Sequence, residues 1–253
     1  MRPYAFLRYA AVCFLLPFLA CQAQAFVDNE LTIGMGGMVY ITPYKSYDTQ
    51  SALIPIVSYE GKYAYVREFS AGVKLVNLDF LEISAFAEYD YTCFKPRNSS
   101  DARLRKLSNR RDSMSLGTAV RLITPYGMLH ASGAHDVLGR NNGLTGLIGY
   151  MNSVEFGPLE LIPAAGVQWS NNSYNNYYYG VSGEESRKSG LNSHHVGSGV
   201  SPYTGLTIDY SLTKSWEIYY SGEWIFLNSA IKNSPMVSRT NTYSLMLGLS
   251  YTF

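Results

Sequence analysis

Carboxylate side chains stand at alternate positions of several short segments, where they could line one cavity. They are Glu82, Glu88, Asp90, Glu160, Asp209, Glu217 and Glu223. Carboxylates that converge on a cavity attract cations, and a close pair of them can act as general acid and base in hydrolysis. Because acid pairs also arise by chance wherever polar and apolar residues alternate, these positions do not by themselves predict an enzyme.

The other residue types that support catalysis or metal binding are not organised into a motif. His194 and His195 are adjacent, so their rings do not converge easily on one ion, and no third ligand stands at a recognisable spacing. Serine, histidine and aspartate all occur, but no nucleophile elbow groups them. We therefore expect no catalytic residues, no cofactor and no metal site.

The C-terminal segment 240–253 indicates which elements position the acids. From Tyr243 to Phe253 every odd position is large and apolar or aromatic, whereas the even positions are small or polar except for Met246. A period of two over a dozen residues predicts a strand with one apolar and one polar face. A last strand that ends on an aromatic residue is typical of an outer-membrane barrel, in which Phe253 would be the assembly signal.

The same alternation predicts eleven further strands, separated by turn residues. They are segments 30–42, 52–59, 62–67, 69–77, 79–91, 113–124, 128–138, 144–156, 159–169, 201–212 and 216–227. With the terminal strand they make twelve, and bacterial barrels have an even number of strands. The weak point is segment 52–77, because two strands there instead of three would shift every later strand to the opposite direction.

The lengths of the connections support this count. If the first strand runs outward, every long connection falls on the outer side and every inner connection is short, apart from one tight outer turn near residue 68. The long connections are 43–51, 92–112, 139–143, 170–199 and 228–240. This asymmetry is typical of outer-membrane barrels. We therefore predict an all-β protein, an antiparallel transmembrane outer-membrane β-barrel of about 12 strands.

The N-terminus has the pattern of a secretory signal peptide. A basic start is followed by an apolar segment, residues 9–20, that is too short to span a bilayer, and residues 23–25 fit a small-x-small cleavage site. We expect residues 1–25 to be cleaved, which leaves a barrel domain of residues 26–253. Cys93 would then be its single cysteine, so that no intramolecular disulfide could form.

Composition narrows the function classes. The signal peptide holds two of the 20 basic residues and none of the 19 acidic ones, so the cleaved chain has a net charge of −1. This balance excludes a strongly basic nucleic-acid-binding protein. With 22 Tyr, 22 Gly and only 15% charged residues, the chain suits a barrel with aromatic girdles, although a secreted β-sandwich would also show alternation.

Two charged regions have alternative interpretations. The predicted inward acids outnumber the inward bases Lys74 and Arg121, so the lumen is either a cation-preferring pore or a filled barrel whose charges pair internally. Segment 93–112 either binds lipopolysaccharide phosphates or is a solvated loop. Its basic residues are Lys95, Arg97, Arg103, Arg105, Lys106, Arg110 and Arg111.

A Tyr-rich stretch is too aromatic for an ordinary flexible loop and should order itself by ring stacking over the barrel mouth or within the lumen. It runs through Tyr177, Tyr178, Tyr179, Gly180, Val181, Ser182 and Glu185. This stretch resembles the Y-Y-Y-G-V-S-x-x-E motif of the MipA/OmpV family of outer-membrane proteins. Ser234-Pro235 resembles the same family's S-P-hydrophobic-V segment before the last strand.

The resemblance implies a non-catalytic protein of the bacterial outer membrane, in contact with its lipids and lipopolysaccharide. It further implies a structural scaffold that joins a murein lytic transglycosylase to a penicillin-binding protein. The alternative is a narrow cation-leaning porin-like channel or a surface-binding, adhesion protein. No scaffold-contact residue can be assigned from the resemblance.

Overall fold

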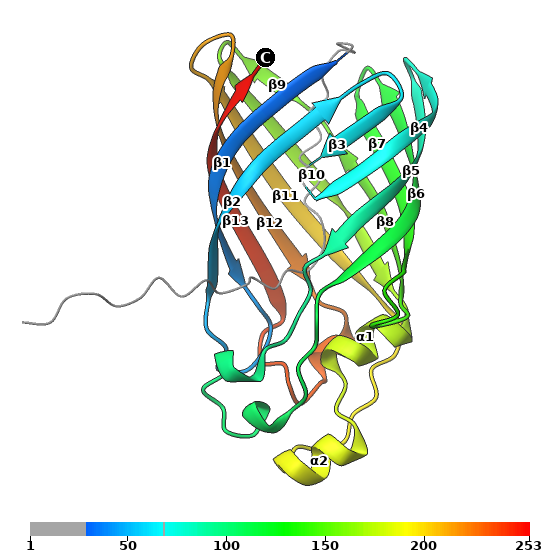
Figure 1. Cartoon of the computed structure of the whole chain (residues 1–253), viewed down its shortest axis with the longest axis vertical. Coiled ribbons are helices and arrows are strands. Elements are labelled where there is room, and N and C mark those ends of the chain that lie inside the picture. Colours follow the sequence, from blue (N-terminus) through cyan, green and yellow to red (C-terminus); the bar gives the residue numbers. More distant parts are fainter. Residues whose placement is uncertain (1–28, 68) are drawn as a thin grey trace, which may run out of the picture.

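The computed structural model describes residues 29–67 and 69–253 (Figure 1). The predicted signal peptide, Cys13 and Cys21 lie outside these residues, so its cleavage stays a prediction. Cys93 is buried. That the cleaved chain forms no disulfide stays a prediction.

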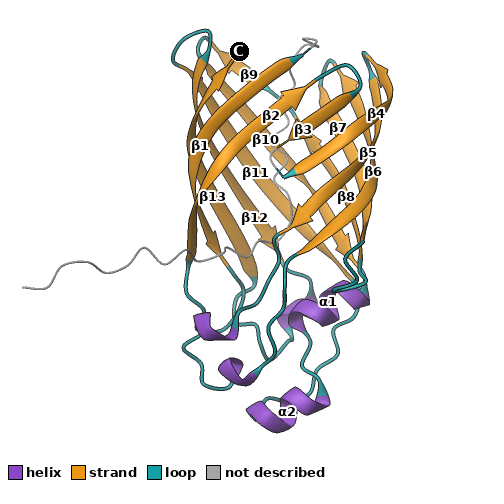
Figure 2. Ribbon diagram, in the orientation of Figure 1, coloured by secondary structure: helices purple, strands orange, loops and turns teal. Residues whose placement is uncertain are grey.

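Within these described ranges, thirteen strands form one antiparallel sheet (Figure 2). They are β1 (Glu30–Ile41), β2 (Gln50–Glu60), β3 (Ala64–Arg67), β4 (Ser70–Leu78), β5 (Leu81–Asp90), β6 (Ser113–Thr124), β7 (Gly127–Asp136), β8 (Leu144–Met151), β9 (Val154–Phe156), β10 (Leu159–Ser170), β11 (Gly199–Ser211), β12 (Trp216–Phe226) and β13 (Asn241–Thr252). β8 and β9 are consecutive pieces that both pair with β10, so they count as one strand of the barrel wall. The barrel therefore has twelve strand positions.

The sheet closes into a barrel. Each strand pairs with its neighbours along the chain, β10 pairs with β11, and β13 pairs with β1 across the seam. The predicted twelve-strand antiparallel barrel is therefore confirmed, including the three strands β2, β3 and β4 within segment 52–77. Among the described residues, no helix is long and apolar enough to cross a membrane.

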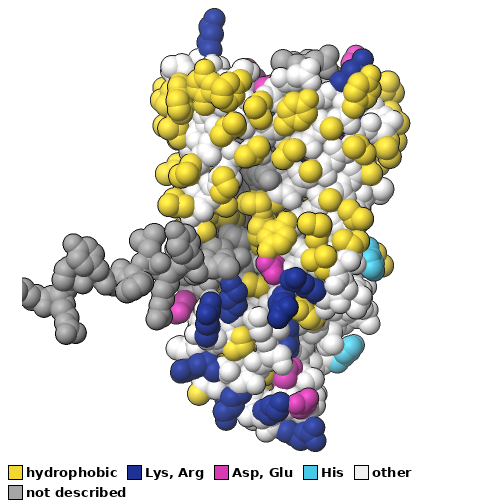
Figure 3. Space-filling model, viewed as in Figure 1, with side chains coloured by type: hydrophobic (Ala, Val, Ile, Leu, Met, Phe, Trp, Pro, Cys, Tyr) yellow, Lys and Arg dark blue, Asp and Glu magenta, His cyan; other side chains and the backbone are white. Residues whose placement is uncertain are grey.

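Side chains alternate between the lumen and the outer surface. In β13, Leu247 is 57% exposed, whereas its neighbour Met246 is 6% exposed and faces inward. Apolar side chains cover the strands on the visible face, and Lys and Arg side chains gather beyond one end of them (Figure 3). An apolar outer band with a polar rim is the surface that a lipid bilayer requires of a barrel.

The two ends of the barrel differ. The turn end, which includes Phe253, has the short connections 61–63, 79–80, 125–126, 157–158 and 212–215. The loop end has the long connections 42–49, 91–112, 137–143, 171–198 and 227–240. The latter contain the 3-10 helices η1 (Pro96–Asn98) and η2 (Leu104–Lys106) and the helices α1 (Asn172–Tyr179), α2 (Gly183–Ser189) and α3 (Ser229–Lys232).

The three prolines within the strands lie where a hydrogen-bond ladder is interrupted. Pro55 lies in the part of β2 that pairs with β1 alone, because β3 reaches only residues 58–60. Pro163 of β10 faces the break between β8 and β9, and Pro202 of β11 precedes the first pair with β12 at Tyr203. Proline has no N–H to donate, so a barrel accepts it at such places.

Candidate functional site

One buried apolar cluster, called the cap core here, holds the long connections of the loop end together. Its residues are Tyr44, Phe94, Leu104, Leu107, Tyr174, Tyr178, Tyr179, Val181, Leu191, Val196, Leu227, Ile231, Met236 and Val237. They come from four of the five long connections. The fifth is joined to them by Asn141, whose Nδ2 donates a hydrogen bond to the Tyr178 hydroxyl at 3.3 Å. All five long connections therefore belong to one packed unit.

Helix α1 places the Tyr-rich motif in this core. Asn171 caps the helix by accepting a hydrogen bond from the Tyr174 N–H at 3.0 Å, which satisfies one of the free donors of the first turn. Tyr174 and Tyr178, four residues apart, share one helix face with their ring centroids 4.8 Å apart. Tyr178 and Tyr179 are completely buried, so the motif orders the loop as the sequence analysis expected of its aromatic rings.

The tyrosines of α1 lie across the barrel mouth. The Tyr174 hydroxyl forms a 2.8 Å hydrogen bond with Thr92, two residues after the end of β5. Burial raises the pKa of Tyr179 well above its ordinary value. The negative charges that Tyr44, Tyr40 and Asp90 carry when ionised raise this pKa further.

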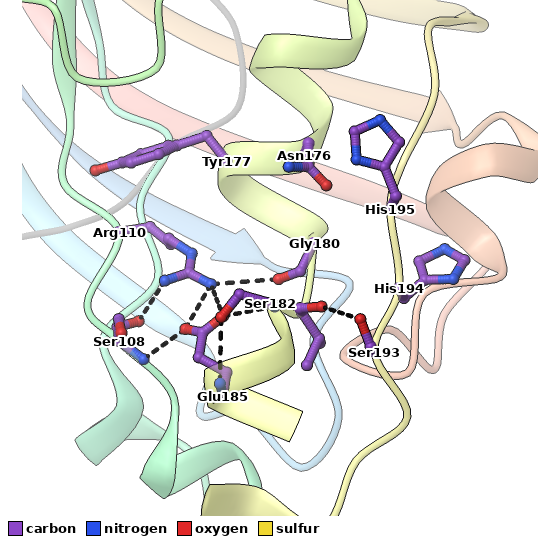
Figure 4. Close-up of a pocket in the computed structure, with 11 residues that line it drawn as sticks. Ser108, Arg110, Asn176, Tyr177, Gly180, Ser182, Glu185, Ser193, His194 and His195 are labelled. Carbon is purple, nitrogen blue, oxygen red and sulfur yellow. Dashed lines mark hydrogen bonds and ion pairs between the residues drawn. The ribbon is translucent and has the colours of Figure 1, made fainter. Parts of the chain in front are cut away.

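Helix α2 begins with a capping box that also forms an ion pair. Ser182 Oγ accepts the Glu185 N–H at 3.2 Å, and Glu185 Oε2 accepts the Ser182 N–H at 3.0 Å. Glu185 also accepts the Ser108 N–H at 2.9 Å and pairs with the guanidinium of Arg110 at 2.8 Å. Figure 4 shows the two side chains facing each other, and both are buried. The motif glutamate therefore joins connection 171–198 to connection 91–112.

The Ser234-Pro235 segment is hydrogen-bonded to the Tyr-rich motif and holds it in place. Ser234 Oγ donates a 2.6 Å hydrogen bond to the backbone carbonyl of Tyr179 and accepts one from the Met236 N–H at 3.1 Å. Pro235 lies half-buried between them, and the Met236 side chain is completely buried in the cap core. Two motifs that are more than 50 residues apart in the chain are thus in direct contact.

A polar pocket of about 390 Å³ lies beside the Arg110–Glu185 pair (Figure 4). Its lining is Ser108, Arg110, Asn176, Tyr177, Gly180, Val181, Ser182, Glu185, Ser193, His194 and His195. In the described part of the chain, His194 Nε2 is buried without a hydrogen-bond partner. Within the same residues, no group of three or more His, Cys, Asp or Glu side chains is placed to hold a metal ion.

The seven predicted inward acids do not form one site. Glu82, Asp90, Asp209 and Glu223 are buried, whereas Glu88, Glu160 and Glu217 are partly buried. Glu82 lies in a cluster of opposite charges, with Arg67 at 3.2 Å, Lys74 at 3.6 Å and Arg121 at 3.8 Å. Glu217 instead lies near Asp209, Glu160 and Glu30 on β12, β11, β10 and β1. Charge pairing therefore accounts for Glu82, whereas Glu217 lies among other acids.

The prediction that the basic residues of segment 93–112 bind lipopolysaccharide phosphates is corrected for one residue. Arg110 is not available to an external phosphate, because its guanidinium is buried and bonded to Glu185, Gly180 and Ser108. Sequence reasoning grouped it with its neighbours, since no sequence signal links Arg110 to a glutamate 75 residues further along the chain. The S-x-x-E spacing of Ser182 and Glu185 could have indicated the capping box, but not this partner.

We expect the cap to loosen in acid because of Glu185. Burial raises the pKa of Glu185, but hydrogen bonds from Ser108 and Ser182 and the charge of Arg110 lower it more, so that the pKa lies below its ordinary value. The ionised Glu185 therefore stabilises the closed cap fully above the pKa that its carboxyl has in the open cap, about 4.3. This stabilisation is lost as the pH falls through the lower pKa of Glu185 in the closed cap. Hydrogen-exchange protection of residues 182–190 should fall in this range.

The control for this titration is the variant Glu185→Gln. It should lose protection already at neutral pH and show little further dependence on acid. Asp101, whose pKa is lowered by Arg103, is unchanged in this variant and reports the background titration of the cap. Equal acid dependence in wild type and Glu185→Gln would contradict the role of Glu185.

The chain matches the family model "MltA-interacting protein MipA" over residues 33–253. It is 32% identical to the MltA-interacting protein of Escherichia coli (strain K12) over 90% of this chain and 92% of that protein. It is also 32% identical to the outer membrane protein YiaT of the same strain, over 97% of this chain and 98% of YiaT.

Two further matches are more distant. Outer membrane protein OmpV of Vibrio cholerae is 27% identical over 59% of this chain and 58% of OmpV. The NanC porin structure aligns with a TM-score of 0.42 and 8% identity over 88% of this chain and 98% of that one. The family match spans nearly the whole barrel, and it confirms the predicted family. This chain is an outer-membrane β-barrel protein that belongs to the MipA/OmpV family.

Proposed function

We propose that the protein is a non-catalytic scaffold of the outer membrane that docks a murein lytic transglycosylase. The cap core carries this proposal, because an apolar cluster from four of the five long connections, with the fifth hydrogen-bonded to it, covers the mouth and favours a closed barrel over a wide pore. The name of the Escherichia coli MltA-interacting protein supports the choice of partner. By family resemblance, a penicillin-binding protein is the second proposed partner.

A periplasmic partner would meet the turn end. Its connections are short, and they expose aromatic side chains: Tyr126 is 82% exposed, Tyr63 71% and Phe80 57%. Aromatic residues supply much of the binding energy of protein interfaces, although they also form the interfacial girdles of barrels. Short connections hold these rings in fixed positions, which suits a rigid docking surface.

The scaffold is tested by retention of a soluble lytic transglycosylase on the immobilised barrel in detergent. We expect the wild-type protein to retain the enzyme and the double variant Tyr63→Ala, Tyr126→Ala to retain much less. Glu184→Ala changes an exposed residue at the opposite end and should bind as wild type does. A wild-type barrel that retains no enzyme would contradict the proposal.

A narrow cation-leaning channel is the second candidate, favoured by the position of Glu217 near Asp209, Glu160 and Glu30, which brings four acids of neighbouring strands together. In planar bilayers this candidate predicts stepwise cation conductance that falls when Glu217 and Glu223 are replaced by glutamine. A bilayer that stays silent, together with retention of the transglycosylase, supports the scaffold instead.

We also propose that lipopolysaccharide phosphates contact the exposed basic residues of connection 91–112, in keeping with a surface-binding role. Arg103, Arg105, Lys106 and Arg111 are exposed there, and Arg110 is excluded by its bond to Glu185. Replacement of these four residues by serine should reduce the lipopolysaccharide that co-purifies with the barrel. The pair Arg187→Ser, Lys188→Ser on α2 is the control for an unspecific loss of positive charge.

Deletion of Phe253 is expected to lower the amount of protein in the outer membrane several-fold. The Phe253 N–H donates a 3.0 Å hydrogen bond to Leu31 across the seam, and its exposed ring lies 4.9 Å from that of Tyr251. Immunoblots of isolated outer membranes measure the effect. Phe253→Tyr keeps a terminal aromatic ring and should assemble normally, whereas normal levels after the deletion would show that Phe253 is not the assembly signal.

A further inference from the structure

The polar pocket beside the Arg110–Glu185 pair, called the cap pocket here, has the size of a site for a small molecule. Its volume of about 390 Å³ lies toward the lower end of the roughly 300–1,000 Å³ that such sites have. Some of its lining residues are exposed, Ser182, Ser193 and His195 among them. A solute can therefore enter the cap pocket from the loop end without crossing the barrel.

Hydrogen bonds fix the walls of the cap pocket. On one side Arg110 is held by its ion pair with Glu185. Figure 4 shows the chain of residues 193–195 on the other side, and the N–H of the next residue, Val196, donates to Asn176 Oδ1 at 3.2 Å. Walls that are already held in place lose little conformational entropy when a ligand binds. The cap pocket is thus preorganised.

The groups that line the cap pocket can both donate and accept hydrogen bonds. The Tyr177 hydroxyl accepts the Arg111 N–H at 3.0 Å and Ser182 Oγ accepts a backbone N–H, so within the described chain both hydroxyls keep a proton for a ligand. Figure 4 shows the His195 ring extending toward Asn176. Sugar hydroxyls have the same dual capacity, and an aromatic ring offers a flat face to a sugar ring. This lining fits a saccharide and not an acyl chain.

The charge of the loop end favours an anionic saccharide. The five long connections hold 13 Lys and Arg residues but only five Asp and Glu residues, although the cleaved chain as a whole has a net charge of −1. Figure 3 shows Lys and Arg side chains gathered at this end. A surface with one predominant sign of charge raises the local concentration of ligands of the opposite sign. Anions therefore collect where the cap pocket opens.

A carboxylate suits the cap pocket better than a phosphate does. Proteins commonly bind phosphate groups with clusters of arginine, whereas the single arginine of this lining, Arg110, is already engaged by Glu185. A carboxylate can accept one hydrogen bond from the ring of His195 and a second from the side-chain amide of Asn176. One negative charge together with several hydroxyl groups is the chemistry of a sugar acid.

We propose that the cap pocket binds a hexuronic acid. Its carboxylate lies at His195 and Asn176, and its ring hydroxyls lie at Tyr177 and Ser182. The site is separate from the exposed basic residues of connection 91–112 to which lipopolysaccharide phosphates are assigned. It also does not depend on the scaffold proposal, because the scaffold partner meets the opposite end of the barrel.

The test is saturation-transfer difference NMR of glucuronate with the whole barrel, refolded in detergent without lipopolysaccharide. About 150 mM salt screens attraction by distant charges, since the Debye length is then about 8 Å. We expect the ring protons of glucuronate to receive saturation. Glucose, which lacks the carboxylate, and acetate, which lacks the hydroxyls, should each bind several-fold more weakly. No signal from glucuronate would overturn the proposal, and so would binding of glucose or acetate as tight as that of glucuronate.

His195→Ala tests whether binding occurs in the cap pocket. It changes an exposed side chain and should weaken glucuronate binding several-fold, with little effect on glucose. Lys232→Ser is the matched control, because it removes an exposed positive charge of the same end from α3, outside the cap pocket. It should bind glucuronate as wild type does. An equal loss in the two variants would mean that the general positive charge alone attracts the sugar, which contradicts the site.

Asn176→Asp tests the position of the carboxylate. The substitution keeps an acceptor for the Val196 N–H and places a negative charge beside the expected carboxylate. We expect glucuronate binding to be lost and the weak binding of glucose to remain, which also shows that the cap pocket is intact. Trypsin digestion at the exposed Arg187 and Lys188 checks that the cap stays closed. Glucuronate binding as tight as in wild type would overturn the assignment of the carboxylate to Asn176 and His195.

Discussion

Replacement of Leu247 by arginine is expected to destabilise the barrel in lipid by about 2–4 kcal/mol, because it places a charge near the middle of the outer apolar band. Leu247 lies at the centre of β13, is 57% exposed and pairs with Gly37 of β1 and Tyr220 of β12. The free energy of unfolding, measured by denaturant titration in vesicles, should fall by this amount, and insertion should slow.

Two arginine variants serve as controls for depth and for side. Leu138→Arg changes an exposed apolar residue of connection 137–143, beyond the strands, and should cost only about 0–1 kcal/mol. Ser250→Arg projects into the lumen beside its register partner Glu217 and should be milder than Leu247→Arg. Equal tolerance of arginine at Leu247 and Ser250 would reverse the assignment of inside and outside.

Replacement of Glu185 by alanine is expected to destabilise the closed cap by about 3–5 kcal/mol, because it leaves the buried guanidinium of Arg110 without its partner. It also removes the acceptor for the N–H groups of Ser108 and Ser182. The measurement is the rate of limited trypsin digestion at Arg187 and Lys188, which are exposed on α2, with the strands protected by detergent.

The matched control is Glu184→Ala. Glu184 forms an exposed ion pair with Lys188 at 2.5 Å, and such pairs contribute about 0–1 kcal/mol. The double variant Glu185→Leu, Arg110→Met removes both charges together and should digest more slowly than Glu185→Ala. If Glu185→Ala and Glu184→Ala digest at the same rate, the buried pair does not hold the cap closed.

The sequence predicts the barrel well because lipid and lumen impose opposite demands on successive side chains. Leu247 and Met246 differ in exposure for this reason, and the alternation that distinguishes them is readable in β13 without a structure. Segment 144–156, predicted as one strand, is broken into β8 and β9. The break faces Pro163 of the neighbouring strand, and pairing with a neighbour cannot be read from the segment itself.

The cap is less predictable because its contacts are between distant residues. Helix α1 consists of Asn, Ser and Tyr, which have modest helix propensity, so the sequence predicts only a long connection there. The helix forms because Asn171 caps it and the cap core buries its tyrosines. The position of Arg67 near Glu82 was likewise not predicted, because Arg67 of the short β3 reaches Glu82 of β5 across the intervening strand β4.

The seam also constrains the order in which the protein can assemble. The hydroxyls of Thr32 and Thr252 are 2.8 Å apart although 220 residues separate them in the chain. Contacts of such sequence separation form slowly, because the entropy of closing a very long loop is lost before the contact stabilises anything. Until β13 reaches β1, both strands present open edges that can pair with other chains. We therefore expect closure of this seam to be the rate-limiting step of assembly. β1 cannot complete its pairing until β13, the last strand of the chain, is in place.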